Sequence, residues 1–401
     1  MKIAIFSQHF FPENFRINYL VDQLKKKHQI FIFTSKPHYN LSKKIVEQYK
    51  KKYFFFTKER NLQIFRVPVF LQQKTYFSKI LNYLTYIINV SFYLLFSKKK
   101  DIDIIFVYAT SPIFQCIPAI LYKFLTRKPL VIWVQDLWPE VLLDLKIPFS
   151  NLISACIRPI INWIYNSSDI ILCQSNSFKR EISKLTNKKT LLFENPSDVN
   201  KNKIIYNYKR NVFSILFAGN LGDAQNLDII LKVGQLLKNS NEKIKINIIG
   251  DGKNFLFLKN SIKNASLSKY IILKGYIPSN QLSKYYLQSS ALLISLVPGS
   301  GISKTIPAKF QSYLAFGRPL LVCSDGEINK IVKKNNLGLV CSSENVNKLY
   351  RNIILLKNMN FKEYKNISFN CFDMYKRNYK ISKKSKKLIS IFKYCIKKFK
   401  H

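Results

Sequence analysis

Short apolar runs alternate with helical patterns along this chain, and the alternation occurs twice in the same order. The first series begins with an apolar run at residues 1–6 and a helical spacing of apolar residues over about 14–27. The second series begins with the run at residues 212–218. Strands that alternate with helices form parallel sheets covered by helices on both faces. Because 401 residues suit two domains better than one, we predict an α/β protein with two doubly wound parallel-sheet domains.

The predicted domains meet at residues 198–211, a segment rich in Asn and Lys that follows no regular pattern. We expect this segment to be the linker between an N-terminal domain at residues 1–197 and a C-terminal domain at residues 212–401. With 47% hydrophobic residues, the chain can form two ordinary cores. Its seven cysteines are scattered and include no Cys-x-x-Cys pair, which is typical of a reduced, cytoplasmic protein with buried thiols.

A possible anion-binding site lies late in the chain. A Gly-Ser-Gly loop at residues 299–301 allows the backbone to approach a ligand closely. It precedes a helix predicted over residues 308–316, which Gly317 would end in a left-handed conformation. The free N–H groups at the start of such a helix attract anions. Lys304 and Lys309 lie on either side of that start and strengthen the prediction.

An acidic and aromatic segment, QDLWPE at residues 135–140, follows the apolar run at residues 130–134. Side chains at the carboxyl end of a parallel strand lie at the edge where open α/β sheets bind ligands. Two carboxylates and an indole are poor material for a core, so we predict that Asp136, Trp138 and Glu140 form part of a site. The alternative is that Asp136 only caps the following helix.

Three motifs together resemble glycosyltransferase family 4. They are GNLGDAQN at residues 219–226, DLWPE at residues 136–140, and PAKFQSYLAFGRP at residues 307–319 with a later Gly-Glu turn. The resemblance covers nearly the whole chain and is closest to the branch found in bacterial O-antigen and capsule clusters, which includes fucosamine-type transferases. It implies a retaining enzyme of GT-B fold, with two Rossmann-like domains facing a cleft that holds a nucleotide-sugar. It also implies a last helix that crosses back to the N-terminal domain.

The chain departs from this family at the donor site. Family members commonly carry two Glu residues separated by seven positions, and Lys304 and Ser312 occupy those positions here. The second Glu of the family holds the nucleotide ribose. The resemblance therefore assigns the ribose to Ser312 or to its neighbour Gln311.

The loop that binds the diphosphate in the wider family also differs in this chain. Its Arg and Lys align with Asn220 and Gln225. The charge of the phosphates must then be met by other residues, for which we expect Lys304, Lys309 and Arg318. Lysines and a helix N-terminus stabilise a departing diphosphate without a metal ion, so we expect a metal-independent enzyme with no cofactor.

The resemblance also assigns the other site residues, by motif. On the donor side it adds Gly219, Gly250, Tyr276 and Glu327. On the acceptor side it assigns His9, Glu13, Arg16 and Trp138, with Asp136 and Glu140 as the catalytic carboxylates. These carboxylates would orient the acceptor hydroxyl or stabilise an oxocarbenium-like state, and a base role stays open. Arg16 has a second interpretation as a solvated helix residue.

The net charge of +43 comes from 65 Lys and Arg against 22 Asp and Glu. Nucleic acid, an anionic membrane and the codon bias of an AT-rich genome are three explanations. The chain has no recognised nucleic-acid module, so we expect no nucleic-acid partner. An anionic membrane surface attracts each nearby Lys or Arg by about 1 kcal/mol. This suits an enzyme with an undecaprenyl-diphosphate-linked acceptor, and we expect a cytoplasmic protein that is peripheral on the inner face of the cell membrane.

One apolar segment, residues 80–96, contains no charged residue. A transmembrane span needs about 20 apolar residues, and this segment contains Asn82 and Asn89. We therefore expect no span. A buried helix is the prediction, and a helix lying in the bilayer surface is the alternative.

The sequence leaves three functions open. The first is transfer of a sugar, N-acetyl-L-fucosamine from its UDP form in the branch that the chain resembles, to a lipid-linked saccharide of O-antigen or capsule. The second is a nucleotide-sugar 2-epimerase of the same fold. The third is a non-catalytic basic scaffold or nucleic-acid binder, because both family Glu residues are missing. Binding of UDP or GDP would separate the enzymes from the scaffold.

Overall fold

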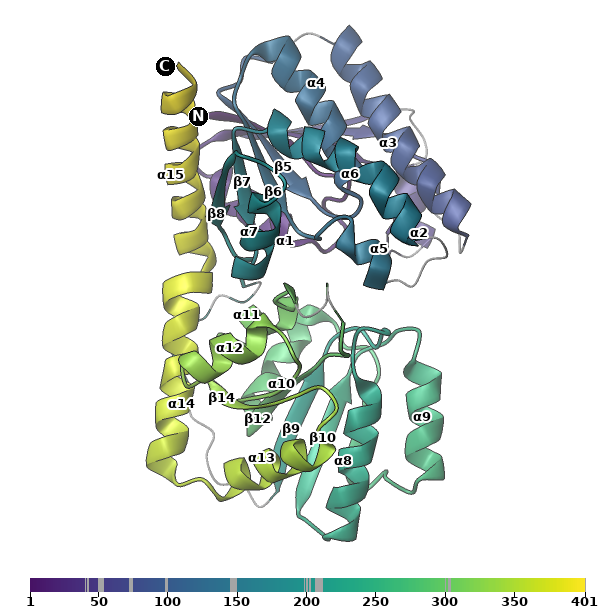
Figure 1. Cartoon of the computed structure of the whole chain (residues 1–401), viewed down its shortest axis with the longest axis vertical. Coiled ribbons are helices and arrows are strands. Elements are labelled where there is room, and N and C mark those ends of the chain that lie inside the picture. Colours follow the sequence, from purple (N-terminus) through teal and green to yellow (C-terminus); the bar gives the residue numbers. More distant parts are fainter. Residues whose placement is uncertain are drawn as a thin grey trace. The chain divides into compact units, whose positions relative to one another are not determined.

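The computed structural model describes residues 1–39, 41, 43–49, 54–71, 75–97, 100–144, 150–197, 199, 201, 203–205, 212–299, 301 and 304–400. Ser300 of the predicted glycine loop and residues 206–211 of the predicted linker lie outside these residues. The chain divides into two compact units, of which the first contains Met1–Pro196 and Ile381–His401 and the second contains Ser197–Lys380. Figure 1 labels helices and strands of both units.

The first unit is built on an eight-stranded sheet with strand order β3-β4-β2-β1-β5-β6-β7-β8. The strands are β1 (Lys2–Phe6), β2 (Gln29–Ser35), β3 (Phe55–Glu59), β4 (Leu62–Val67), β5 (Ile104–Ala109), β6 (Leu130–Val134), β7 (Ile170–Cys173) and β8 (Lys189–Leu192). Neighbouring strands are parallel except β3 and β4. The helices are α1 (Arg16–Leu24), α2 (Lys43–Gln48), α3 (Tyr76–Phe96), η1 (Ile113–Cys116), α4 (Ile117–Thr126), α5 (Glu140–Asp144), α6 (Ser150–Ser167), α7 (Asn176–Ser183) and α15 (Ile381–Lys400).

The second unit is built on a parallel sheet with strand order β11-β10-β9-β12-β13-β14. The strands are β9 (Phe213–Ala218), β10 (Ile244–Ile249), β11 (Ile271–Leu273), β12 (Ala291–Ser295), β13 (Leu320–Cys323) and β14 (Gly338–Cys341). The helices are α8 (Leu227–Asn239), α9 (Phe255–Asn264), η2 (Ser279–Gln281), α10 (Leu282–Gln288), α11 (Ala308–Leu314), α12 (Glu327–Lys334), α13 (Val346–Asn358), α14 (Phe361–Met374) and η4 (Tyr375–Tyr379). The predicted α/β architecture with two parallel-sheet units is confirmed.

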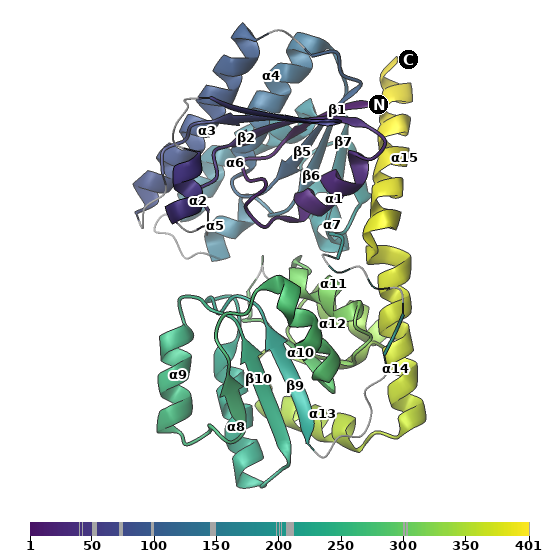
Figure 2. The ribbon, with the colours of Figure 1, turned by 180° about the vertical axis from the view of Figure 1, so that it is seen from behind.

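Each face of the first sheet has its own apolar core. Helices α3, α4, α6 and α7 pack on one face, and α1 and α15 pack on the other. Figure 2 shows α1 on the side of the sheet that is turned away in Figure 1. Leu388 and Phe392 of α15 are buried in this second core, and Lys384 pairs with Glu194 at 2.6 Å. The basic last helix is therefore an integral part of the first unit.

Helix α3 contains the uncharged segment at residues 80–96. Tyr86, Val90 and Leu94 recur at every fourth position and are buried against the sheet. On the other side of the helix, Ile88 is 60% exposed and Phe92 is 54% exposed. The prediction of a buried helix is therefore wrong for one side of α3. By length and composition alone, the helix is long and apolar enough to cross a membrane.

The described residues of the predicted linker lie on the second unit. Val199 and Ile204 pack against the core formed by α11, α14 and their strands. The carbonyl of Val199 accepts a hydrogen bond from the Tyr375 hydroxyl at 3.1 Å. This part of the segment therefore packs on the second unit.

Candidate functional site

The strand order locates the edge of each sheet at which a ligand would bind. In an open parallel sheet, ligands bind beyond the carboxyl ends of the strands, where the strand order reverses. The reversal lies between β1 and β5 in the first unit and between β9 and β12 in the second. Most predicted site residues follow these strands and their neighbours β6 and β10, and the two groups are described separately.

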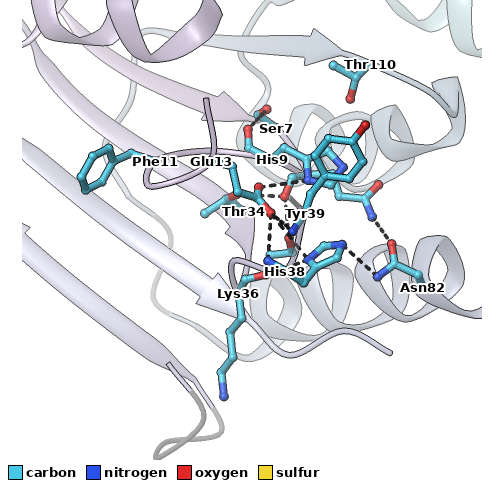
Figure 3. A network of polar contacts seen from close by, with 12 residues as sticks. Ser7, His9, Phe11, Glu13, Thr34, Lys36, His38, Tyr39, Asn82 and Thr110 are labelled. Carbon is cyan, nitrogen blue, oxygen red and sulfur yellow. Dashed lines mark hydrogen bonds and ion pairs between the residues drawn. The ribbon is translucent and has the colours of Figure 1, made fainter. Parts of the chain in front are cut away.

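His9 follows β1 and is fixed by Glu13 (Figure 3). Its Nδ1 lies 3.0 Å from Glu13 Oε2, and its ring stacks on Phe15 with centroids 4.9 Å apart. The other carboxylate oxygen, Glu13 Oε1, accepts the backbone N–H groups of His38 and Tyr39 at 2.9 and 2.7 Å. Burial opposes ionisation of Glu13, but His9 and these N–H groups hold the pKa of its carboxyl below the usual value. Because no described residue bonds to His9 Nε2, this nitrogen is the atom through which His9 can meet a ligand.

His38 follows β2 and uses both ring nitrogens within the protein. Nδ1 donates to the Lys36 carbonyl at 2.9 Å, and Nε2 accepts from Asn82 Nδ2 at 3.1 Å. This pattern is that of a neutral ring, and burial lowers the pKa of His38 in agreement with it. His9, Glu13 and His38 offer three potential metal ligands within 4.8 Å of one another. Because Glu13 and His38 are already saturated with hydrogen bonds, the cluster fits a positioning network rather than a metal site.

Asp136 follows β6 and is held by Ser111, which follows β5. The Ser111 backbone N–H and hydroxyl donate to Asp136 Oδ2 at 2.9 and 2.8 Å. The Ser111 hydroxyl also accepts from Trp138 Nε1 at 3.1 Å. Burial raises the pKa of Asp136, and the hydrogen bonds from Ser111 oppose that rise. Within the described chain no donor reaches Oδ1, so this oxygen is available to a substrate hydroxyl. The hydrogen bonds of Asp136 thus join it to Ser111 after β5 and not to the start of the following helix.

Arg16 and Asp136 both act on one buried side chain, Tyr108 at the end of β5. Burial raises the pKa of Tyr108, and the charges of Arg16 and Asp136 then act on it in opposite directions. Arg16, at the start of α1, therefore lies at the same edge of the sheet as Asp136. Arg16 is partly buried and its Nη1 atom is buried, so it is not a fully solvated helix residue.

Trp138 and Glu140 lie more deeply than expected for acceptor contacts. Trp138 is 8% exposed and packs edge-on against Phe114, so its role in the structure is to orient Ser111. Glu140 starts α5, and its Oε2 is buried without a hydrogen-bond partner among the described residues. The carboxylate contributes to the raised pKa of Tyr165, of which burial is the main cause.

Several polar side chains at this edge were not predicted. Gln8 donates through Nε2 to Asn82 Oδ1 at 2.7 Å, and its backbone N–H donates to Gln115 Oε1 at 3.0 Å. Gln115 in turn donates to the Thr110 carbonyl at 2.6 Å. The network joins the ends of β1 and β5 to α3. Its members are 74 and 107 residues apart in sequence, so no local pattern could have indicated them.

In the second unit, Lys309 of α11 lies against the loop that follows β9. Its Nζ donates to Gln225 Oε1 at 2.7 Å and lies 3.6 Å from the centroid of the Phe217 ring. A Cβ atom added to Gly219 would lie 3.2 Å from Nζ. Burial lowers the pKa of Lys309 to about 7, because an amide and a ring do not neutralise an ammonium group. Within the described residues no carboxylate pairs with Lys309, and a bound anion would stabilise its charge.

The position of Lys309 is fixed by contacts between α11 and two loops. The Tyr313 hydroxyl accepts the backbone N–H of Ala218 at 2.8 Å, which ties α11 to the end of β9. Gly250, with φ +152°, lies so close to the neighbouring loop that an added Cβ would be 1.9 Å from the Gly219 carbonyl oxygen. Gly219, Gln225, Gly250 and Lys309 thus lie together; their role in donor binding stays a prediction.

The two residues predicted to hold the ribose lie inside α11. Gln311 is 1% exposed, and its amide nitrogen donates to the carbonyls of Pro307 and Ala308 at 3.2 and 2.8 Å. Ser312 is also buried. The Gln311 amide therefore bonds back to carbonyls at the start of its own helix. The helix ends before Gly317, which has the predicted left-handed conformation (φ +58°).

Arg318 was predicted to contact phosphate, and this prediction is wrong. Its side chain is fully buried, and it donates to the carbonyls of Ile205, Phe316 and Leu287. A guanidinium group used in this way joins backbone segments within the second unit. It presents no charge to a ligand.

The other predicted donor residues differ in their exposure to solvent. Tyr276 is 73% exposed, Asn220 is exposed and Lys304 is partly buried. Glu327 is buried in the first turn of α12, where a negative charge suits the positive end of the helix.

The sequence contains an Asp-x-Asp pair, Asp101 and Asp103, which precedes β5, so the expectation of a metal-independent enzyme cannot rest on the absence of such a pair. Asp103 accepts the Lys2 backbone N–H at 2.8 Å, and Asp101 pairs with the Lys2 ammonium at 2.5 Å. The pair lies at the amino end of β5, opposite the edge that carries His9 and Asp136. It is therefore not part of the candidate site.

Residues 198–371 match the family described as glycosyl transferases group 1. An uncharacterized glycosyltransferase of Haemophilus influenzae is 27% identical over 190 residues, which are 47% of this chain and 48% of that protein. The match thus spans about half of that relative.

Solved structures resemble the whole chain. HepE of Anabaena in complex with UDP covers 98% of this chain and 100% of its own, with 12% identity and a TM-score of 0.67. Sucrose-phosphate synthase of Thermosynechococcus elongatus covers 98% of each chain, with 12% identity and a TM-score of 0.72. At such identity these likenesses show the fold. The chain therefore has the predicted GT-B fold, and its residues 198–371 are similar to the glycosyl transferases group 1 family.

Proposed function

We propose that this protein is a retaining, metal-independent glycosyltransferase that moves a sugar from a nucleoside diphosphate to a lipid-linked saccharide. The second unit binds the donor, and the first unit supplies the groups that act on the acceptor. A UDP-sugar is the first donor to test, because the structurally similar HepE was solved with UDP and with UDP and glucose. UDP-N-acetyl-L-fucosamine and a role in O-antigen or capsule synthesis are the specific form suggested by the motifs.

The observation that carries this proposal is the environment of Lys309. Burial lowers the pKa of Lys309 to about 7, its hydrogen-bond partner is a neutral amide, and no described residue serves as its counter-ion. Lys309 lies beside the loop at Gly219, in the unit that contains the residues similar to the group 1 family. A diphosphate would supply the missing charge. In the reaction, the same ammonium group would stabilise the negative charge that develops on the departing nucleoside diphosphate.

The first unit contributes two groups with an atom left for a ligand. Asp136 Oδ1 would accept a hydrogen bond from the acceptor hydroxyl, while Ser111 keeps Oδ2 in place. His9 Nε2, oriented by Glu13, would bind a second acceptor oxygen. Orientation of this kind lowers the barrier because the reacting hydroxyl no longer has to be ordered in the transition state.

The test is a thermal-shift and calorimetric screen with UDP, GDP, the corresponding nucleosides and UDP-sugars. A ligand at about 100 times its dissociation constant stabilises by about 2.7 kcal/mol, which is readily measured. We expect stabilisation by a nucleoside diphosphate and little by its nucleoside. The absence of binding to every nucleotide would refute the enzyme and support a scaffold. Conversion of a UDP-sugar to its 2-epimer without an acceptor would replace transfer with epimerisation.

A further inference from the structure

Helix α3 exposes an apolar stripe that nothing in the described chain covers. Ile80, Leu84, Ile88 and Phe92 recur at every fourth position and are between 47% and 60% exposed. Residues at this spacing lie above one another on one side of a helix. Soluble proteins rarely expose a contiguous row of large apolar side chains without a use for it.

The apolar surface continues onto two neighbouring helices. Helices α3, α4 and α6 pack on the same face of the first sheet, and Figure 1 shows them beside one another. Phe124 of α4 is 82% exposed and Trp163 of α6 is 48% exposed. We call the exposed sides of these helices the three-helix surface. It is an extended face of one compact unit, not a single exposed side chain.

The charges of the three-helix surface favour a lipid partner. The sequences of α3, α4 and α6 contain no Asp or Glu. Lys79 and Arg158 on the helices, and Arg127 directly after α4, are exposed. An apolar face with Trp and Phe side chains and basic residues is typical of protein surfaces that lie in the interface of an anionic bilayer.

We propose that the three-helix surface docks on an anionic lipid bilayer, with α3 lying along the membrane plane. The inference rests on the proposed function, because an enzyme with a lipid-linked acceptor has to reach that acceptor at a membrane. A spanning orientation is excluded by the buried side of α3, where Asn82 donates to His38 and to the Phe70 carbonyl and accepts from Gln8. Removal of α3 from the sheet would break this network.

The same contacts place the docking helix next to the candidate acceptor groups. Asn82 is fully buried and bonds to His38, whose neighbour Tyr39 and own backbone N–H hold Glu13. One side of α3 therefore faces lipid, and the other side belongs to the network that orients His9. A lipid-linked acceptor would approach this network from the docked membrane.

The test is binding of the full-length protein to phosphatidylglycerol-containing vesicles and to pure phosphatidylcholine vesicles, measured by co-sedimentation. Ile88→Glu with Phe92→Glu should weaken binding to the anionic vesicles about tenfold or more, because two apolar side chains no longer enter the interface. Leu256→Glu on α9 is the matched control, since Leu256 is an exposed apolar residue of the second unit, and it should bind as the unaltered protein does. Higher salt should weaken binding, because screening shortens from about 10 Å at 0.1 M to about 3 Å at 1 M.

Trp163 provides a second readout. The other two tryptophans, Trp133 and Trp138, are buried, so brominated lipids should quench Trp163 fluorescence only, and Trp163→Phe should abolish the effect. Absence of vesicle binding, or equal loss in the Leu256→Glu control, would overturn the proposal. The proposal would also be overturned if light scattering showed a dimer that the double variant Ile88→Glu with Phe92→Glu dissociates, while vesicle binding stayed unchanged. UDP binding is measured on the same variants. Loss of vesicle binding with intact UDP binding concerns the membrane proposal alone, whereas absence of UDP binding concerns the proposed function.

Discussion

Replacement of Lys309 by Met should selectively weaken binding of nucleoside diphosphates. The substitution keeps most of the side-chain volume beside Phe217 and Gly219 and removes only the ammonium group. A hydrogen bond to a charged partner contributes about 1.5–3 kcal/mol, so UDP affinity should fall by roughly 10- to 100-fold. Uridine lacks the phosphates and should bind Lys309→Met and the unaltered protein equally.

Because the pKa of Lys309 is lowered, UDP binding should be coupled to proton uptake by this residue. With a pKa of about 7, Lys309 is half protonated at neutral pH in the free protein. A bound diphosphate favours the charged form, so UDP binding should take up about 0.5 proton at pH 7 and about 0.9 at pH 8. Affinity should therefore decrease as the pH rises above 7. The same shift makes the free protein more stable as the pH rises from 7 toward the unfolded lysine value, because the unfolded state binds more protons there.

Isothermal titration calorimetry in buffers of different ionisation enthalpy measures both quantities. Lys309→Met should show weaker UDP binding, no proton uptake at pH 8 and a higher melting temperature without ligand. Equal losses for UDP and uridine would remove Lys309 from the phosphate site. Proton uptake that persists in Lys309→Met would assign the titrating group elsewhere.

Three further predictions concern the remaining site. Ser111→Ala removes a hydrogen bond that opposes the raised pKa of Asp136, so the acid limb of the pH profile of kcat/KM should move to higher pH. An unchanged acid limb would show that Asp136 is not the group that titrates there. Glu13→Gln should cost about 2–3 kcal/mol of stability at neutral pH in urea unfolding; because the folded pKa of Glu13 is lowered, the difference should shrink as the pH falls through that pKa, and a pH-independent difference would contradict an ionised Glu13–His9 pair. Gly250→Ala places a Cβ 1.9 Å from a carbonyl oxygen and should lower the melting temperature, whereas normal stability would show that the two loops separate easily.

The fold could be predicted from the sequence because its signals are local. Apolar runs of strand length alternate with helical spacing, and this pattern alone indicates parallel sheets. The motifs around Gly219 and Asp136 also lie directly after β9 and β6, as the preceding apolar runs indicated, and side chains that follow parallel strands gather at one edge. For these elements the local sequence and the tertiary structure agree.

The partners of the site residues could not be predicted, because they come from distant segments. Ser111 and Asp136 are 25 residues apart, and His38 and Asn82 are 44 apart. Arg318 looked available from its sequence position, yet the carbonyls that surround it come from elsewhere in the unit. A charge in a sequence does not reveal whether it meets solvent, a ligand or the backbone.

Helix α3 shows most clearly what the spacing of apolar residues cannot predict. Its exposed stripe of Ile80, Leu84, Ile88 and Phe92 is as apolar as its buried stripe, so periodicity indicates a helix but cannot distinguish the side that packs on the sheet. The distinction comes from Asn82, a polar residue that is buried only because distant donors and acceptors satisfy it. Asn82 fixes which side of α3 faces the sheet. No segment of the described chain packs on the opposite, exposed side. Its lack of acidic residues is the reason for proposing an anionic bilayer as its partner, and the opposite side of the same helix belongs to the network around His9.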